Sequence, residues 1–281
     1  MVKKIIAFLI LSSMSCDTGN LTLIADLPNA LAEVSGMECQ NDSSEVWMLN
    51  DSGNKAKLYR LDRRGTIKHE IKIDAKNHDW EDLTTDNEGN LYIGDFGNNL
   101  SKRKNLVILK VNKDDLERFD EVAVERISFK YPNQSKFPPK KKQMYFDSEA
   151  FLYFNDSLYI FTKSRVRGNF GRTDLYKVPA KRGQHIATYI DSFTTCEDLD
   201  CWITAADISD DGGKVVLLTP KSAWLFTEFK GDNFFSGRIE ELPFNHRSQK
   251  ESLCFKTNNM LYIADERANG SGGNLYEFNL N

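Results

Sequence analysis

Five short segments decide the fold of this chain: Ser35-Gly36-Met37, Glu81-Asp82-Leu83, Glu149-Ala150-Phe151, Thr204-Ala205-Ala206 and Glu251-Ser252-Leu253. Each segment begins with a side chain that carries an oxygen, and a second apolar run follows each of them. The segments recur at intervals of 46 to 68 residues. Self-similarity of this kind is typical of propellers and solenoid arrays, in which each repeat forms one structural unit.

The rest of the chain has the pattern of a β protein. Short apolar or alternating runs are separated by Asn, Asp, Gly and Lys, and helical periodicity is almost absent. The runs form four sets of four and a fifth set of only three. A spare run at 21–26 precedes the first set, and pairing it with the fifth set would close a ring without open edges. The sequence therefore predicts an all-β fold, a five-bladed β-propeller closed by the N-terminal strand.

The composition is that of an ordinary soluble globular protein, with 40% hydrophobic and 28% charged residues among 281. This length suits one large domain or two small ones. The net charge of −4 lacks the basic excess of a general nucleic-acid binder. We therefore expect no nucleic-acid partner, and we expect a monomer.

The first residues predict export. Two lysines precede an apolar stretch at 5–11 that is too short to span a bilayer, and small residues then lead to Cys16. This arrangement resembles a bacterial lipoprotein signal, although Ser13 replaces the usual aliphatic residue. The resemblance implies a signal peptide at 1–15, a propeller at 16–281, and a lipid anchor on Cys16 that attaches the protein to a membrane of the bacterial cell envelope, periplasmic or surface. An ordinary secretory signal is the alternative.

Four further cysteines remain in an exported chain, where disulfides are permitted. Cys196 and Cys201 bracket a short polar loop, and we expect a disulfide between them. Cys39 and Cys254 lie in apolar runs of the first and last repeats, and we expect them to be buried free thiols that pack as small hydrophobes. No second pair or histidine cluster accompanies Cys196 and Cys201, so they do not indicate a zinc site.

The leading oxygens of the five repeats predict a metal site. In a radial fold they would converge near the axis, where three glutamates would repel one another unless their pKa values rise or a cation neutralises them. Calcium prefers oxygen ligands. We therefore predict one Ca²⁺ ion as cofactor; the alternative is a polar, water-filled channel. The predicted ligands are Ser35, Glu81, Glu149, Thr204 and Glu251.

Further polar residues flank this ring. Because side chains alternate along a strand, Asp79 and Asp147 would share the face of the glutamates two places later. A second group follows the second strand of each blade and would lie on one rim. On that rim these residues would bind a small anionic substrate. The alternative is that the Asn and Asp residues only build turns. The candidates for substrate binding are Lys163, Arg165, Asp95, Asn98 and Arg267.

The ring is similar to the central calcium site of the calcium-activated nucleotidases, the five-bladed apyrases. Their order of ring residues, one per blade, matches the five predicted ligands, with Thr204 in place of a serine. The resemblance implies calcium at the ring. The residues with which that family handles nucleotides have no match in this chain.

The chain also resembles the SdiA-regulated group of exported bacterial propellers. Two phrases carry this resemblance, Asn50-Asp51-Ser52-Gly53 and Gly94-Asp95-Phe96-Gly97-Asn98-Asn99. The resemblance implies a propeller fold and an envelope location.

Two functions are compatible with these features. The first is a binding module of the cell envelope that recognises a protein partner or a glycan, with calcium holding the blades together. The alternative is a calcium-dependent hydrolase of a phosphorylated, nucleotide-like or ester substrate, in which the metal polarises the substrate and Asp79, Asp147 or Asp51 acts as the general base. The chain has no G-x-S-x-G or H-E-x-x-H motif, so the sequence leaves open whether it is an enzyme.

Overall fold

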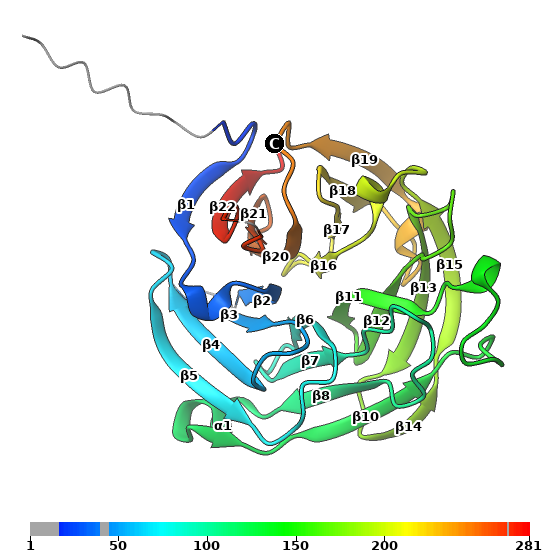
Figure 1. Ribbon diagram of the computed structural model, residues 1–281, viewed down its shortest axis with the longest axis horizontal. Helices are drawn as coiled ribbons and strands as arrows, with labels where there is room; N and C mark the ends of the chain where they lie inside the picture. Colours follow the sequence, from blue (N-terminus) through cyan, green and yellow to red (C-terminus); the bar gives the residue numbers. More distant parts are fainter. Residues whose placement is uncertain (1–16, 40–44, 269) are drawn as a thin grey trace, which may run out of the picture.

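The structure is a computed structural model that describes residues 17–39, 45–268 and 270–281. Five mainly antiparallel β-sheets stand around a central axis like the blades of a propeller (Figure 1). This arrangement confirms the predicted all-β, five-bladed propeller. The predicted signal peptide and the lipidation site at Cys16 lie outside the described residues. No helix in the described part of the chain has the length and apolar character needed to cross a bilayer.

The strands of each blade follow one another from the axis outward. Blade 1 contains β2 (Val34–Cys39), β3 (Glu45–Asn50), β4 (Lys57–Asp62) and β5 (Ile67–Ile73). Blade 2 contains β6 (Trp80–Thr85), β7 (Leu91–Asp95), β8 (Val107–Val111) and β10 (Glu125–Lys130). Blade 3 contains β11 (Asp147–Phe154), β12 (Ser157–Lys163), β13 (Arg172–Pro179) and β15 (Thr188–Thr194). Blade 4 contains β16 (Ala205–Ile208), β17 (Lys214–Leu218), β18 (Ser222–Thr227) and β19 (Arg238–Pro243).

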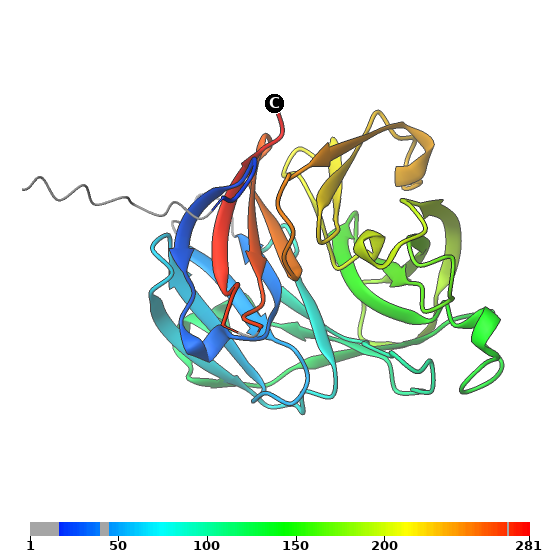
Figure 2. The ribbon, with the colours of Figure 1, turned by 45° about the horizontal axis from the view of Figure 1, so that its top comes forward.

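Blade 5 joins the two ends of the chain. It contains β20 (Lys250–Thr257), β21 (Met260–Asp265), β22 (Asn274–Asn279) and the N-terminal strand β1 (Thr22–Asp26). β1 pairs antiparallel with β22, and the two strands lie side by side in both ribbon views (Figures 1 and 2). The Arg267 guanidinium also donates to Asp26 Oδ1 at 2.6 Å, beside this closure. The N-terminal strand therefore closes the ring, as the three-run fifth set predicts.

Two short strands pair with the outer strand of the preceding blade. β9 (Glu121–Val122) follows the helix α1 (Lys113–Arg118) within blade 2 but pairs parallel with β5 of blade 1. β14 (Gly183–Ile186) lies in blade 3 but pairs parallel with β10 of blade 2. Each strand covers the outer edge of the preceding blade, which links blades 1, 2 and 3 and reduces the exposed edge.

The core consists of apolar clusters that lie between adjacent blades. Trp47 and Leu83, for example, belong to the cluster between blades 1 and 2, and Phe151 belongs to the cluster between blades 2 and 3. Similar clusters lie between blades 3 and 4, 4 and 5, and 5 and 1. Each blade thus buries both of its faces against its neighbours, and the polar side chains at the axis are left outside this core.

Both pairs of described cysteines form disulfides. Cys196 and Cys201, the pair predicted from the sequence, are bonded. The expectation that Cys39 and Cys254 are free thiols is wrong, because they are bonded to each other with their Cα atoms 5.7 Å apart. These two residues are 215 positions apart in the sequence, but ring closure places the inner strands β2 and β20 side by side. The disulfide therefore links the first blade to the last.

Candidate functional site

A β-bulge occurs at the predicted ring position in four of the five inner strands. In blade 2, Trp80 pairs with Asp95 and Asp82 pairs with Gly94, so Glu81 between them has no partner across the strand pair. The same shift in register falls at the leading residues of blades 1, 3 and 5. A bulge bends the strand and turns a side chain away from the regular alternation. Here it sets the leading residues of these blades apart from the regular ladder at the start of the inner strand.

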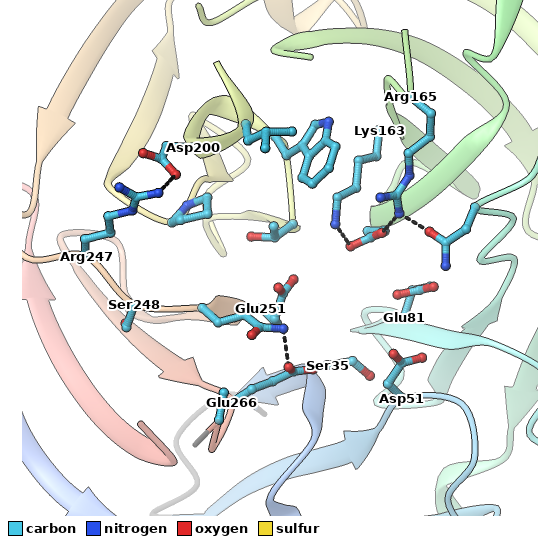
Figure 3. A pocket seen from close by; sticks show the side chains of 18 of the residues that line it. Ser35, Asp51, Glu81, Lys163, Arg165, Asp200, Arg247, Ser248, Glu251 and Glu266 are labelled. Atoms are coloured by element: carbon cyan, nitrogen blue, oxygen red, sulfur yellow. Dashed lines mark hydrogen bonds and ion pairs between the residues drawn. The ribbon is translucent and has the colours of Figure 1, made fainter. Parts of the chain in front are cut away.

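The five leading residues line one pocket on the axis, with a volume of about 770 Å³ (Figure 3). The structure therefore brings together all five residues that the sequence places at the ring: Ser35, Glu81, Glu149, Thr204 and Glu251. Asp51 and Glu266 add carboxylates to the same wall, and Asn99 and Gln249 add amides.

The two hydroxyl groups of the ring join neighbouring blades. Ser35 Oγ in blade 1 donates to the carbonyl of Trp80 in blade 2 at 3.0 Å. Thr204 Oγ1 at the start of blade 4 donates to the carbonyl of Lys250 in blade 5 at 2.7 Å. These bonds use the hydroxyl protons and leave the oxygen lone pairs available as acceptors.

The blade 3 side of the ring carries its own positive charges. Lys163 Nζ donates to Glu149 Oε2, and Arg165 Nη2 donates to Glu149 Oε1 at 2.8 Å. Arg165 Nε also donates to Asp147 Oδ2 at 2.6 Å. Both cations lie about 5 Å from the Trp202 ring, at 5.1 Å for Lys163 and 4.8 Å for Arg165. Glu149 is therefore neutralised within the protein.

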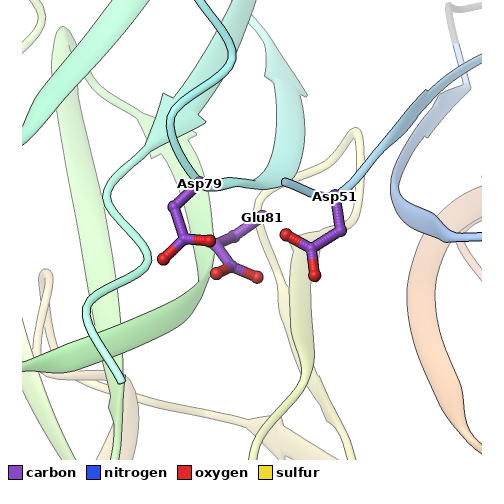
Figure 4. A group of neighbouring side chains, drawn as sticks. All are labelled: Asp51, Asp79 and Glu81. Carbon is purple, nitrogen blue, oxygen red and sulfur yellow. The ribbon is translucent and has the colours of Figure 1, made fainter. Parts of the chain in front are cut away.

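The adjacent part of the ring, at blades 1 and 2, is acidic. Carboxylate oxygens of Asp51, Asp79 and Glu81 lie within 4.8 Å of one another, the only such group of potential metal ligands among the described residues (Figure 4). Gly97 packs against two of these residues. A Cβ atom at this position would overlap Glu81 Oε1 and lie only 2.6 Å from Asp79 Cγ. The site therefore depends on a residue without a side chain in the loop that follows β7.

These carboxyl groups have raised pKa values. Burial, with repulsion from Glu149 and Asp51, raises the pKa of Glu81 well above its usual value. Burial raises the pKa of Asp51 to about 6 and also raises that of Asp79. Burial and the nearby Glu251 raise the pKa of Glu266 to about 8. Buried carboxylates without enough positive charge favour either a proton or a bound cation.

The other predicted site residues hold the surrounding loops. Burial raises the pKa of Asp147 to about 6, and its carboxylate accepts from the Asn98 N–H at 2.6 Å. Asp95 is buried and accepts from Arg103 at 2.7 Å and from His78 at 2.9 Å. Asp95, Asn98 and Arg267 do not line the axial pocket.

The pocket also contains residues that sequence reasoning missed. Asp200 and Arg247 form an ion pair of 2.5 Å in its wall. They lie 47 positions apart, and neither belongs to a repeated motif, so the sequence carries no signal for them. Glu266 follows the second strand of blade 5 directly, and it also lines the pocket.

Comparisons with known proteins support the fold. No family model matches the chain, and a search of curated proteins finds no match. Among solved structures, the PQQ-bound aldose sugar dehydrogenase of Streptomyces coelicolor aligns with a TM-score of 0.51 at 9% identity, over 92% of this chain and 97% of that one. Virginiamycin B lyase of Staphylococcus aureus aligns at 0.44 and 14% identity, over 91% and 69%. At these identities the likeness shows the propeller fold alone.

Proposed function

We propose that this chain is a calcium-dependent binding module of the bacterial cell envelope that recognises a glycan or a protein partner at its axial pocket. The observation that carries this proposal is the convergence of the carboxylates of Asp51, Asp79 and Glu81, two of which, Asp51 and Glu81, line a pocket of about 770 Å³. A pocket of this volume is within the usual range for small ligands.

The donor set fits calcium. All three side chains offer carboxylate oxygens, which calcium prefers, and carboxylates that bind through both oxygens can supply most of the six to eight ligands it takes, about 2.3–2.6 Å away. Ser35 and Glu251 line the same pocket and can complete the set. The metal site that we propose thus lies toward blades 1 and 2, because Lys163 and Arg165 already neutralise Glu149.

The charges of the pocket favour binding over hydrolysis of an anionic substrate. Three basic side chains line the described pocket, and each is paired with a carboxylate: Lys163 with Glu149, Arg165 with Asp147 and Glu149, and Arg247 with Asp200. An anionic substrate would have to compete with these pairs for its cations. Vicinal hydroxyl groups, in contrast, can bind to a metal and to the carboxylates and amides of the wall.

Calcium titration by calorimetry tests the metal site. Wild-type protein stripped with a chelator is expected to bind one calcium ion, and Glu81→Gln is expected to lose most of this heat because it removes a charged ligand. Glu240→Gln, on the exposed outer strand of blade 4, is the matched control. No binding by the folded wild-type protein, or equal binding by both variants, would contradict the site.

Two further experiments test the remaining parts. Cys16→Ala is expected to move the protein out of the membrane fraction, and unchanged fractionation would refute the lipid anchor.

A panel of nucleoside diphosphates and aryl esters, with and without calcium, is expected to show no turnover. Metal-dependent turnover would instead support the calcium-dependent hydrolase.

A further inference from the structure

A second cavity lies on the outer side of the acidic cluster. It is a groove of about 750 Å³ in blade 1, between the loops 51–56 and 74–79. Four lysines and a histidine line it, and no Asp or Glu does, in a chain whose net charge is −4. The basic residues are Lys55, Lys57, Lys72, Lys76 and His78.

The groove and the axial pocket lie on the same rim. β3 and β5 both run antiparallel to β4, so the loops that follow them leave blade 1 at one edge. Each loop contributes to both sites. The first carries Asp51 at the acidic cluster and Lys55 in the groove, and the second carries Asp79 and Lys76. One ligand can therefore reach both.

The two loops are bonded to each other. The Asn77 side-chain amide donates to the carbonyl of Asn50 at 3.1 Å and to that of Asp51 at 2.9 Å. Asn77 is buried and lines the groove. The distance between the lysines and the acidic cluster is therefore held by the fold.

The lysines remain able to bind an anion. Lys57 pairs with Glu70 at 2.6 Å and Lys72 pairs with Glu121 at 2.7 Å, but both pairs are solvent-exposed and weak. Lys55 and Lys76 are exposed and form no ion pair with any other described residue. His78 uses Nδ1 for Asp95 and keeps its second ring nitrogen.

The residue types indicate an extended acidic ligand. Lysines are flexible point charges, and the groove has no arginine fork that would clamp one phosphate or carboxylate through two parallel bonds. Lys57 and Lys72 lie opposite each other on β4 and β5, which spreads the charge along the groove. The apolar part of the lining is aliphatic, from Ala56, Ile73 and Ala75.

The absence of aromatic residues argues against a single-stranded nucleic acid in the groove. Proteins that bind single strands stack the bases on aromatic side chains, and no Phe, Tyr or Trp lines this groove. Small aliphatic residues can instead contact the C–H groups of a sugar ring. We infer that the lysine groove binds the repeated carboxylate or phosphate groups of an acidic polysaccharide, and that hydroxyl groups of the same chain reach the proposed axial calcium. This inference rests on the proposed function and names its ligand class.

Binding to polygalacturonate, with neutral dextran as the uncharged control, tests the inference in buffer with calcium. The variant Lys55→Ala/Lys76→Ala is expected to bind polygalacturonate about tenfold more weakly, which corresponds to about 1.4 kcal/mol. Lys136→Ala/Lys181→Ala removes two exposed lysines elsewhere and is expected to bind like the wild type. Raising the salt concentration should reduce the difference between the two variants.

The possible results separate the groove from the metal site. The inference would be overturned if the groove variant and the control variant lost equal affinity for polygalacturonate. It would also be overturned if the folded wild-type protein did not bind polygalacturonate. Tighter binding of a single-stranded oligonucleotide than of polygalacturonate would also overturn it. Calcium titration of the groove variant is expected to match the wild type. If the wild-type protein binds no calcium but still binds polygalacturonate through its lysines, the proposed metal site is rejected and the groove remains supported.

Discussion

Arg165 Nη2 lies 2.8 Å from Glu149 Oε1, and this contact makes the axial ring asymmetric. Glu149 and Glu81 occupy equivalent positions in their blades, but only Glu149 has cations bound to it. The consequence is a division of roles. On blade 3 a carboxylate is part of a buried ion network, and on blade 2 the equivalent carboxylate belongs to the group that we propose as the metal site.

The asymmetry predicts opposite effects for two similar substitutions. Glu149→Gln leaves Lys163 and Arg165 without their shared charge, and removing one partner of a buried pair costs about 3–5 kcal/mol. We expect this variant to lose stability in urea but to retain calcium binding. Glu81→Gln removes buried repulsion, so without calcium it should be at least as stable as the wild type. Loss of calcium binding in Glu149→Gln with an unchanged unfolding midpoint would contradict this division.

Gly97→Ala tests the acidic cluster without changing its charge. The added Cβ would overlap Glu81 Oε1 and crowd Asp79, so the two carboxylates must move apart. We expect at least tenfold weaker calcium binding, the equivalent of about 1.4 kcal/mol, measured by calorimetry.

The control for this variant is Gly213→Ala in the turn before β17. An added Cβ there meets only the flexible side chain of Asp211, at 3.2 Å. Equal calcium affinity in the two variants would show that Gly97 does not shape the site.

The disulfide between blades 1 and 5 predicts a large loss of stability when it is removed. It closes a loop of more than 200 residues, and removing such a native bond costs about 2–5 kcal/mol. We expect Cys39→Ser/Cys254→Ser to unfold at a lower urea concentration than Cys196→Ser/Cys201→Ser, whose cysteines are five positions apart. Equal midpoints for the two double variants would argue against this ordering.

The sequence predicts the fold well because its signal is repeated. Five leading residues and an incomplete fifth set indicate both the number of blades and the strand that closes them. The convergence of Ser35, Glu81 and Glu251 follows from the same repeat. The pairing of β9 and β14 with neighbouring blades does not follow from the repeat, because each strand is short and its partner is set by tertiary contacts.

The charge balance of the site could not be predicted from the repeat. Lys163 ends β12 and Arg165 follows it, which places both on the rim, but the spacing of the residues does not show that they pair with Glu149 and Asp147. The disulfide of Cys39 with Cys254 likewise depends on the packing of the inner strands of two blades. Residue type and spacing along the chain reveal neither the distance from Lys163 and Arg165 to the carboxylates nor the distance between Cys39 and Cys254.

The end of the axis away from the ring of leading residues contains a second set of buried carboxyl groups. Asp207 accepts hydrogen bonds from the Phe255 and Ile208 N–H groups, both at 2.7 Å. Burial raises its pKa from 3.8 to about 7, and the acidic side chains that face it are Glu38, Asp82 and Asp210. Burial also raises the pKa values of Glu38 and Asp82, so this end of the axis retains protons that the unfolded chain would release.

These groups predict that stability falls as the pH rises. A carboxyl group with a raised pKa binds its proton more tightly in the folded state, so it favours folding most below pH 3.8 and loses that contribution as the pH rises to about 7. We expect the urea midpoint of the wild type to decrease across this window, measured without calcium. Asp207→Asn cannot ionise at this position and should show a shallower decrease, although it loses one acceptor oxygen. A wild-type midpoint that rises with pH across this range, or a slope unchanged in Asp207→Asn, would refute this account of the buried carboxyl groups.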